Sequence, residues 1–189
     1  MKPEPQKFRV TIPVKAYIKR FIELNYGDPA DFTDDPETNK YFLNLLKKPN
    51  TYFEKKYPDE ICTYTQEVEV LISGHVFYKY GWELTKTDIV AFGRYFEVRV
   101  KFFMRTFIGM YHGVGLPFKN SITKFQERFG FDEDSWAYQS IKKDFYRRGE
   151  SHIIDFDNEI FQKIEKINLR NMYSLGTISK KALQHYDNN

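Results

Sequence analysis

The sequence predicts an α+β fold that is mainly helical, with a long central buried helix, surrounding amphipathic helices and a small sheet of short strands. Three observations lead to this prediction. Apolar residues recur at steps of three and four in several stretches, which is the spacing of one helix face. Alternation of apolar and polar residues, typical of a strand, is confined to short stretches. The 189 residues also include 18 Phe, 14 Tyr and 2 Trp, whose rings bury enough area for a substantial core.

The N-terminal stretch predicts a strand followed by a helix. Residues 1–7 contain two prolines and alternating charges, so we expect a flexible lead. FRVTI at 8–12 alternates and is predicted to be a short strand. Pro13 suits the first turn of a helix. That helix is expected over 14–26, with Gly27 as its stop.

A second helix and a second strand follow. Asp34 or Asp35 is placed to cap the helix and Pro36 to begin it, since a side-chain oxygen before a proline is a common helix start. Its expected apolar face consists of Tyr41, Phe42, Leu45 and Leu46. Residues 63–73 are rich in β-branched side chains and alternate, which predicts a strand. One of its faces is expected to carry Val68, Val70 and Ile72.

The central helix has the clearest start signal in the chain. Thr85 is placed as its N-cap and Asp88 as the third helical residue, the arrangement of a capping box. Apolar residues then continue on several sides to about Tyr111, and the glycines of 109–117 are interpreted as the helix stop. A helix of this kind is either central and buried or paired with another chain. The alternative to burial is therefore an oligomer contact through 85–111. The polar edge of the helix is formed by Arg94, Glu97, Lys101 and Arg105.

Residues 121–148 predict a helix-turn-helix-like unit. The first helix is expected to begin at Asn120 or Ser121 and to end at Gly130, because glycine commonly follows a helix C-terminus. The second is expected to begin after Asp132 or Ser135. The side chains predicted to face inward are Ile122, Phe125 and Phe129 in the first helix and Trp136, Ile141 and Phe145 in the second.

SHIIDF at 151–156 is predicted to be a strand, and Asp157 is placed to cap a further helix. In element order, residues 121–156 resemble winged helix-turn-helix proteins, in which a β-wing follows the recognition helix. This resemblance implies DNA binding. We expect one globular domain over 8–175, with the helix-turn-helix-like unit within it at 119–156. A polar tail is expected over 176–189.

The candidate DNA-binding residues are polar side chains expected on the outer faces of the two helices. Gln139 and Ser140 are of the types that bond to base edges, whereas Lys and Arg contact phosphates. The predicted phosphate contacts of the second helix are Lys142, Lys143, Arg147 and Arg148, and those flanking them on the first helix are Lys119, Lys124 and Arg128. The expected function is a cytoplasmic DNA-binding regulator or replication accessory of a phage or mobile element. Abundant Lys, Asn, Ile, Phe and Tyr suggest an AT-rich coding genome. Such a genome in turn suggests a phage or mobile element.

A second interpretation explains the same charges without DNA. The acids of 132–134 would stabilise the N-terminus of the second helix, and its basic residues would complement its C-terminus. The turn is also longer than the three or four residues usual for the motif. The protein would then be a non-enzymatic structural or assembly protein of a phage or mobile element that acts through protein–protein contacts.

Enzymatic, metal and cofactor chemistry is not expected. Cys62 is the single cysteine, and a lone thiol without a nearby base is usually a buried apolar residue. The four histidines (His75, His112, His152 and His185) lack the paired spacing of a zinc site. No apolar run is long enough to cross a membrane. The net charge of +3 permits a nucleic-acid partner without requiring one.

Overall fold

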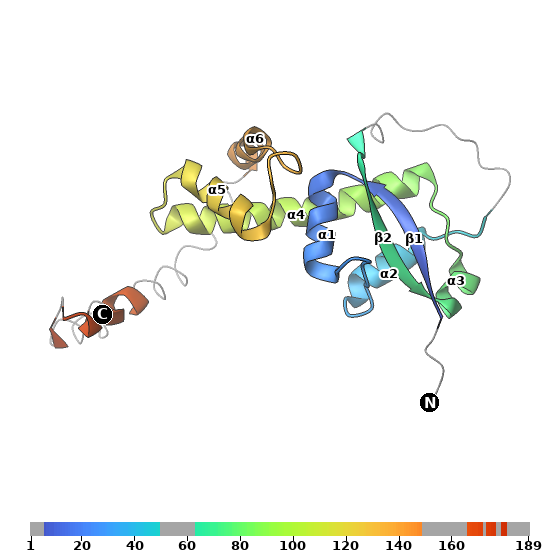
Figure 1. The fold of residues 1–189 in the computed structure, drawn as a ribbon, viewed down its shortest axis with the longest axis horizontal. Coiled ribbons are helices and arrows are strands. Elements are labelled where there is room, and N and C mark those ends of the chain that lie inside the picture. The colour runs from blue at the N-terminus through green and yellow to red at the C-terminus, as the bar shows by residue number, and fades with distance from the viewer. Residues whose placement is uncertain (1–5, 50–62, 149–165, 172, 177–178, 181–189) are drawn as a thin grey trace.

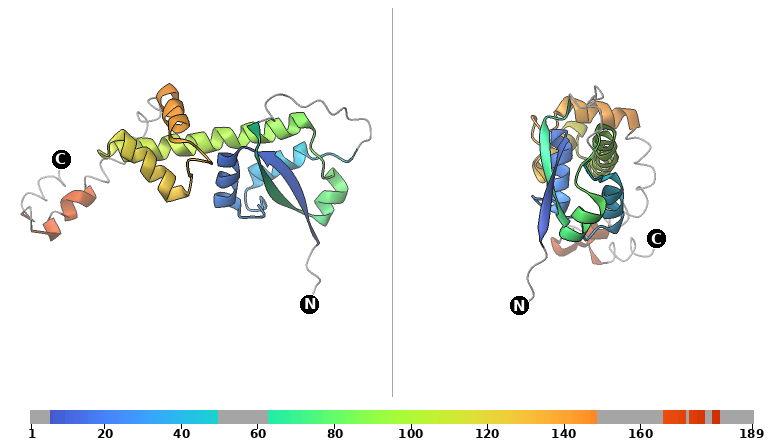
Figure 2. Two further views of the ribbon diagram at one scale, coloured as in Figure 1. Left: turned by 45° about the horizontal axis from the view of Figure 1, so that its top comes forward. Right: turned by 90° about the vertical axis from the view of Figure 1, so that its right-hand side faces the viewer.

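A single long helix, α4 (Lys86–Gly113, 28 residues), runs through both halves of the molecule. The computed structural model describes residues 6–49, 63–148, 166–171, 173–176 and 179–180. At 1.5 Å per residue α4 is about 42 Å long. The sheet and helices α1 to α3 gather around its N-terminal half, and α5 and α6 lie along its C-terminal half (Figures 1 and 2). The mainly helical α+β fold with a long central helix is confirmed.

The sheet consists of two antiparallel strands, β1 (Lys7–Val14) and β2 (Gln66–Ser73). Its register pairs Lys7 with Ser73 and Val14 with Gln66. In each strand the buried residues alternate with exposed or half-buried ones, as a one-sided sheet requires. The buried side chains are Val10, Ile12 and Val14 of β1 and Val68, Val70 and Ile72 of β2. The predicted apolar face of the second strand is therefore confirmed.

The prediction that Pro13 begins a helix was wrong. Pro13 lies in β1, paired with Glu67, and α1 (Ala16–Tyr26) begins three residues later, after Lys15 as its N-cap. The fixed φ of proline is compatible with an extended strand as well as with a first helical turn. In a two-stranded sheet, each strand also has an open edge where the missing N–H costs no ladder hydrogen bond.

Helix α2 (Pro36–Leu45) begins as predicted, with the Asp35 carboxylate accepting a hydrogen bond from the Thr38 N–H at 3.0 Å. Helix α3 (Gly74–Tyr80) was not predicted. Its seven residues are too few to show a helical period. It is held instead by packing, since the ring of Phe77 stacks on that of Phe8 with centroids 4.1 Å apart.

A polar cluster joins the start of α2 to α4 beside the core. The Arg99 guanidinium donates to Asp35 at 3.3 Å and to the Thr38 hydroxyl at 2.8 Å, and the Tyr26 hydroxyl donates to Asp35 at 2.8 Å. Burial alone would raise the pKa of Asp35. The hydrogen bonds from Thr38, Tyr26 and Arg99 outweigh it and hold that pKa well below its usual value. The cluster thus fixes the angle between α2 and α4.

The capping box predicted for α4 is present. The Asp88 N–H donates to the Thr85 hydroxyl, and the Thr85 N–H donates to the Asp88 carboxylate. The buried stripe of α4 includes Phe92, Phe96, Val100, Met104 and Ile108. Burial is not complete, however. Val98 is 70% exposed and Phe102 is 54% exposed, so the apolar residues beyond one stripe do not all enter the core.

The predicted strand 151–156 and the helix start at Asp157 lie outside the described residues, as do Cys62, His152 and His185. Residues 166–171 are helical and mostly exposed. No helix among the described residues has the length and apolar character needed to span a bilayer.

Replacing Phe96 by alanine tests the core around α4. Phe96 is fully buried and contacts the rings of Phe32 and Phe92, so we expect Phe96→Ala to lower the free energy of unfolding by about 3–5 kcal/mol. The matched control is Val98→Ala on the exposed side of the same helix, for which the expected change is within about 0.5 kcal/mol. Urea unfolding measures both, and equal effects would contradict this assignment of the core.

Candidate nucleic-acid interface

Helices α5 (Phe118–Phe129) and α6 (Tyr138–Arg148) form the predicted helix-turn-helix-like unit and pack on α4. The first helix begins at Phe118, just after Pro117, rather than at Asn120 or Ser121. Its predicted end is confirmed. Gly130 adopts the left-handed conformation, with φ 67° and ψ 37°, and donates its N–H to the carbonyl of Gln126.

The turn between the two helices spans 130–137 and is anchored in the core by two aromatic side chains. Phe131 and Trp136 both enter the core, and the Gln126 amide donates to the Trp136 carbonyl at 2.9 Å. Trp136 was predicted to lie in the second helix. It lies in the turn, because α6 begins only at Tyr138. An inward apolar residue next to a helix start is hard to distinguish from the first residue of the helix.

Helix α1 anchors this turn. The ring of Tyr17 stacks on that of Trp136 with centroids 4.6 Å apart, and the Arg20 guanidinium donates to the Phe129 carbonyl at 3.0 Å. A cation bonded to the last carbonyls of a helix also complements its dipole. The unit is therefore mounted on the N-terminal half of the molecule.

The acidic residues of the turn have structural roles. The Asp132 carboxylate accepts from the Ser135 N–H at 2.7 Å, and Glu133 accepts from the Tyr138 N–H, the first of α6, at 2.9 Å. The prediction that the acids stabilise the start of the second helix is confirmed for Glu133. Hydrogen bonds from Ser135 also lower the pKa of Asp132, so this acid stays charged.

Asp144, the one acidic residue of α6, is turned toward α4. The Arg105 guanidinium donates to it from Nε at 2.9 Å and from Nη2 at 2.6 Å, and the Lys101 ammonium lies 3.6 Å away. The Arg105 side chain is only 10% exposed. This pair fixes the rotation of α6 about its axis and removes the carboxylate from the outer side of the helix.

The outer side of α6 carries a stripe of exposed polar residues, here called the outer stripe, formed by Gln139, Ser140, Lys143 and Arg147. Steps of three and four residues place them on one helix face. Among the described residues, no carboxylate is paired with Lys143 or Arg147. Four of the nine predicted site residues are thus brought together.

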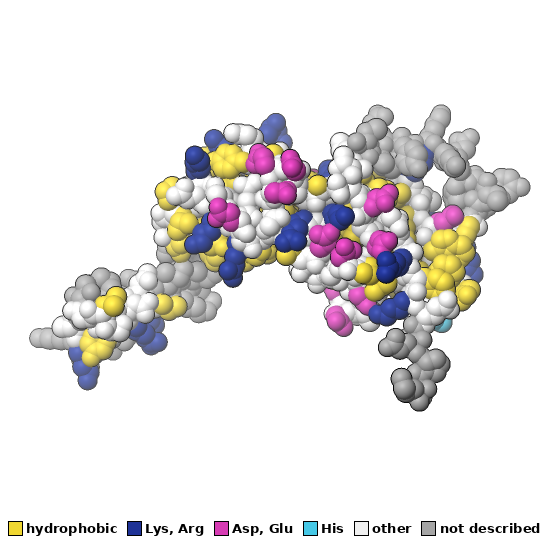
Figure 3. Space-filling model, viewed as in Figure 1, with side chains coloured by type: hydrophobic (Ala, Val, Ile, Leu, Met, Phe, Trp, Pro, Cys, Tyr) yellow, Lys and Arg dark blue, Asp and Glu magenta, His cyan; other side chains and the backbone are white. Residues whose placement is uncertain are grey.

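The other five predicted residues lie around the outer stripe. Lys142 is half-buried with its ammonium 6.0 Å from the Tyr146 ring centroid, and Arg148 faces the side of α4. The predicted residues of α5 are all exposed but are spread along that helix. They are Lys119, Arg128 and Lys124, whose ammonium lies 5.5 Å from the centroid of the Tyr111 ring. Figure 3 shows basic and acidic side chains interspersed over the α5 and α6 region on the face that it displays.

A hollow of about 570 Å³ lies between α4 and α6 and is here called the basic pocket. Its lining residues are Arg94, Glu97, Val98, Lys101, Arg105, Asp144, Arg147 and Arg148. Arg94, Lys101 and Arg105 were predicted from their spacing to lie on the polar edge of the central helix, but they were not assigned to a site. The spacing of these residues along the sequence shows that they share one edge of the helix. It does not show that this edge lies beside α6.

Glu97 stabilises the floor of this pocket. Its carboxylate accepts from the Lys101 ammonium at 2.5 Å and from the Lys15 ammonium of the loop before α1 at 2.9 Å. Burial acts to raise the pKa of Glu97, but these two hydrogen bonds outweigh it and lower the pKa from 4.5 to about 2. The carboxylate therefore remains ionised near neutral pH and holds both lysines in place.

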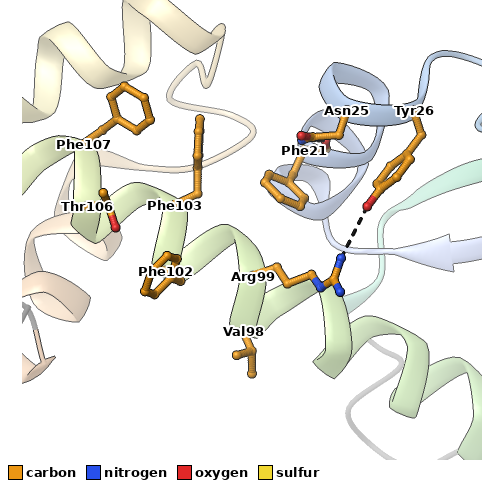
Figure 4. A pocket seen from close by; sticks show the side chains of 9 residues that line it. All are labelled: Phe21, Asn25, Tyr26, Val98, Arg99, Phe102, Phe103, Thr106 and Phe107. Carbon is orange, nitrogen blue, oxygen red and sulfur yellow. Dashed lines mark hydrogen bonds between the residues drawn. The ribbon is translucent and has the colours of Figure 1, made fainter. Parts of the chain in front are cut away.

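A second hollow, of about 480 Å³, lies between α1 and α4 and is here called the apolar groove (Figure 4). Its walls are Phe21, Asn25, Tyr26, Val98, Arg99, Phe102, Phe103, Thr106 and Phe107. Figure 4 shows Val98 and Phe102 projecting from the outer side of α4. The groove is a candidate for protein–protein contact rather than for nucleic acid.

Comparisons with protein-family models, with curated proteins and with solved structures found no match. Within the described ranges, no three His, Cys, Asp or Glu side chains come together as metal ligands would. The geometry of α6 and its surroundings is therefore the basis for assigning a function.

The depressed pKa of Glu97 predicts a pH dependence of stability. A carboxyl whose pKa is lower in the folded chain stabilises it above the unfolded pKa, and this contribution is lost as the pH falls toward the folded pKa. The free energy of unfolding should thus fall as the pH is lowered from about 4.5 to about 2. The free energy of unfolding of the Glu97→Gln variant should fall less over the same range. The control is Glu127→Gln, an exposed residue of α5. Urea unfolding at a series of pH values measures this dependence. If the free energy of unfolding changes with pH equally in wild type and in Glu97→Gln, the role of Glu97 is contradicted.

Proposed function

We propose that this protein binds double-stranded DNA through the outer stripe of α6. The observation that carries the proposal is an exposed helix face of Gln, Ser, Lys and Arg from which the only carboxylate of the helix is turned away. Amide and hydroxyl groups such as those of Gln139 and Ser140 bond to base edges in the major groove. Cations such as Lys143 and Arg147 neutralise phosphates.

The mounting of α6 supports this proposal. Ile141 and Phe145 bury its inner side, Asp144 is bonded to α4, and the turn before it is anchored on α1. These three sets of contacts hold α6 in a fixed orientation, so its outer side chains point in a fixed direction. This reduces the entropy lost on binding. In this proposal Lys142, Arg148 and the three basic residues of α5 contact the flanking phosphates. The protein acts as a cytoplasmic regulator or replication accessory of a phage or mobile element.

Fluorescence anisotropy with labelled duplex DNA tests this function. The seven phosphate contacts of this proposal, four from α6 and three from α5, predict a slope of about −6.3 for log affinity against log salt, so affinity should fall about 6,000-fold between about 50 and 200 mM salt. The double variant Lys143→Glu/Arg147→Glu should abolish binding, because each reversal removes one attraction and adds one repulsion.

A control with the same charge change is Lys40→Glu/Lys79→Glu, in which both residues are exposed and lie on α2 and α3. It should bind DNA nearly as the wild type does. Absence of binding by the wild type, or undiminished binding by Lys143→Glu/Arg147→Glu, would overturn the proposal.

The apolar groove favours a second candidate function, a structural or assembly protein that associates with further copies of itself through α4. Val98 and Phe102 protrude from α4 at the margin of the same groove. A two-fold axis would place the protruding side chains of each copy against the groove of the other, as a self-complementary interface requires. Aromatic anchors in apolar grooves carry most of the affinity of such contacts.

Sedimentation velocity at several concentrations, with and without duplex DNA, separates the two candidates. The second candidate is supported if the protein self-associates in the absence of DNA and the Phe102→Ser variant does not. Tyr78→Ser, which changes an even more exposed aromatic residue on α3, should leave the association unchanged. A monomer at every concentration in the absence of DNA would exclude this candidate.

A further inference from the structure

Aromatic side chains form a surface cluster around α3, at the end of the molecule opposite to α6 (Figure 1). This cluster is here called the aromatic platform and consists of Phe8 of β1, Phe77 and Tyr78 of α3, and Trp82, which follows α3. Phe8 and Phe77 pack against the core, whereas Tyr78 is 68% exposed and Trp82 is 39% exposed. Figure 3 shows apolar side chains gathered over α3 at the right-hand edge of that view. The platform therefore presents aromatic surface that the core does not bury.

The rings of the platform form a continuous stack. The centroid of the Phe77 ring lies 4.1 Å from that of Phe8 and 4.2 Å from that of Trp82, and the planes of Phe77 and Trp82 are only 4° from parallel. The Tyr78 ring meets Phe77 edge-on at 5.3 Å. In the part of the chain that the structure describes, no other ring and no cation contacts the Trp82 indole. Trp82 therefore ends the stack, and no ring occupies its second face.

The backbone holds Trp82 in a fixed position. Gly81 has a φ of 99°, and its N–H donates to the Phe77 carbonyl at 3.1 Å where α3 ends. A side chain at Gly81 would come within 2.1 Å of the Lys47 carbonyl oxygen, so this position requires glycine. The Trp82 N–H donates to the same oxygen at 3.1 Å. The indole is thus held at the surface in advance, and less entropy is lost when a ligand stacks on it.

Two exposed lysines flank Trp82. Lys48 directly follows the residue whose carbonyl binds the Trp82 N–H, and Lys79 lies in the last turn of α3. The Lys79 ammonium lies 5.0 Å from the centroid of the Tyr80 ring. Within the described ranges, no carboxylate is paired with either lysine. Glu83 follows Trp82 and is exposed, so two cations and one carboxylate leave this surface with one excess positive charge.

Flat rings beside cations suit an unpaired nucleic-acid strand, because its bases stack on the rings and its phosphates are attracted to the cations. We propose that the aromatic platform binds single-stranded DNA, with one base stacked on the second face of Trp82 and with Lys48 and Lys79 beside the adjoining phosphates. This site shares no residue with the outer stripe and goes beyond the proposed function. Only the choice of DNA over RNA rests on that function, which already assigns DNA to the chain.

Tryptophan fluorescence of the full chain tests this proposal directly. The protein has two tryptophans, and Trp136 is only 5% exposed, so a ligand at the surface acts on the emission of Trp82. A short oligo(dT) should quench that emission, because a base stacks on the indole. A duplex of the same length should not, because its bases are already stacked on one another. Trp82→Phe keeps a ring in place and should still bind oligo(dT), but the quenching should be lost.

Fluorescence anisotropy with labelled oligo(dT) measures the contribution of each group. Trp82→Ala should weaken binding about 5- to 150-fold, the range expected for the loss of one stacked base. Lys48→Gln/Lys79→Gln should make the salt slope shallower by about 1.4, since each phosphate contact of a single strand contributes about 0.7. The matched control is Tyr173→Ala, which changes an aromatic residue of similar exposure, 42%, outside the platform. It should bind as the wild type does.

Circular dichroism establishes that each variant is folded. The proposal is wrong if oligo(dT) does not quench Trp82, or if folded Trp82→Ala binds oligo(dT) as tightly as wild type. If Trp82→Ala does not fold, the quenching in wild type and its loss in Trp82→Phe decide the question. Tighter binding of oligo(rU) than of oligo(dT) would overturn the assignment to DNA.

A variant of the outer stripe separates this inference from the proposed function. Lys143→Gln/Arg147→Gln should weaken the binding of duplex DNA and leave the quenching of Trp82 by oligo(dT) unchanged. Absence of duplex binding by wild type would overturn the proposed function, and the platform would still be judged by its quenching. Loss of the quenching in Lys143→Gln/Arg147→Gln would show that the strand is held by α6 and would overturn the platform as a separate site.

Discussion

The unbroken apolar stripe of α4 is the constraint on which the rest of the structure depends. A helix of this length cannot bury its stripe against one small sheet, so it requires partners along its whole course. Strand β1 with α1 and α2 packs against the first half, and α5 with α6 covers the second. One continuous core results, from Phe92 near the start of the helix to Ile108 near its end. The position of α6 is thus set by the same helix that supports the sheet.

Charge distribution around α4 follows from the same arrangement. Arg105 sits on the buried margin of the helix, and an unpaired guanidinium there would be costly. Asp144 supplies its partner, and this requirement turns the acid of α6 inward and the outer stripe outward. The ion pair between Arg105 and Asp144, which stabilises the packing of α6 on α4, therefore also leaves the outer stripe of α6 without a carboxylate. The same margin of α4 provides the basic pocket, whose outer wall includes Val98 of the apolar groove.

Local signals in the sequence were sufficient for much of this fold. The cap at Asp35, the capping box at Thr85 and the stop at Gly130 depend on neighbouring residues, and all three were predicted and confirmed. Pro13 was misassigned because its backbone angle suits a strand and a helix start alike. Contacts distant in sequence could not be predicted. The hydrogen bond from Arg105 to Asp144 joins residues 39 positions apart. Without knowledge of this contact, the sequence does not show which charged residues of α6 face inward and which face outward. It also does not show that α4 lies beside α6.

The anchoring of the turn on α1 has a consequence for how the chain folds. The hydrogen bond from Arg20 to Phe129 joins residues 109 positions apart. Contacts of such separation must close a long loop before they stabilise anything, and they slow folding. During synthesis the N-terminus would leave the ribosome well before its anchor partner, so the final orientation of α6 is set late. A fragment that begins after α1 would lack both anchors of the turn, and its second helix would lose the support that aims it.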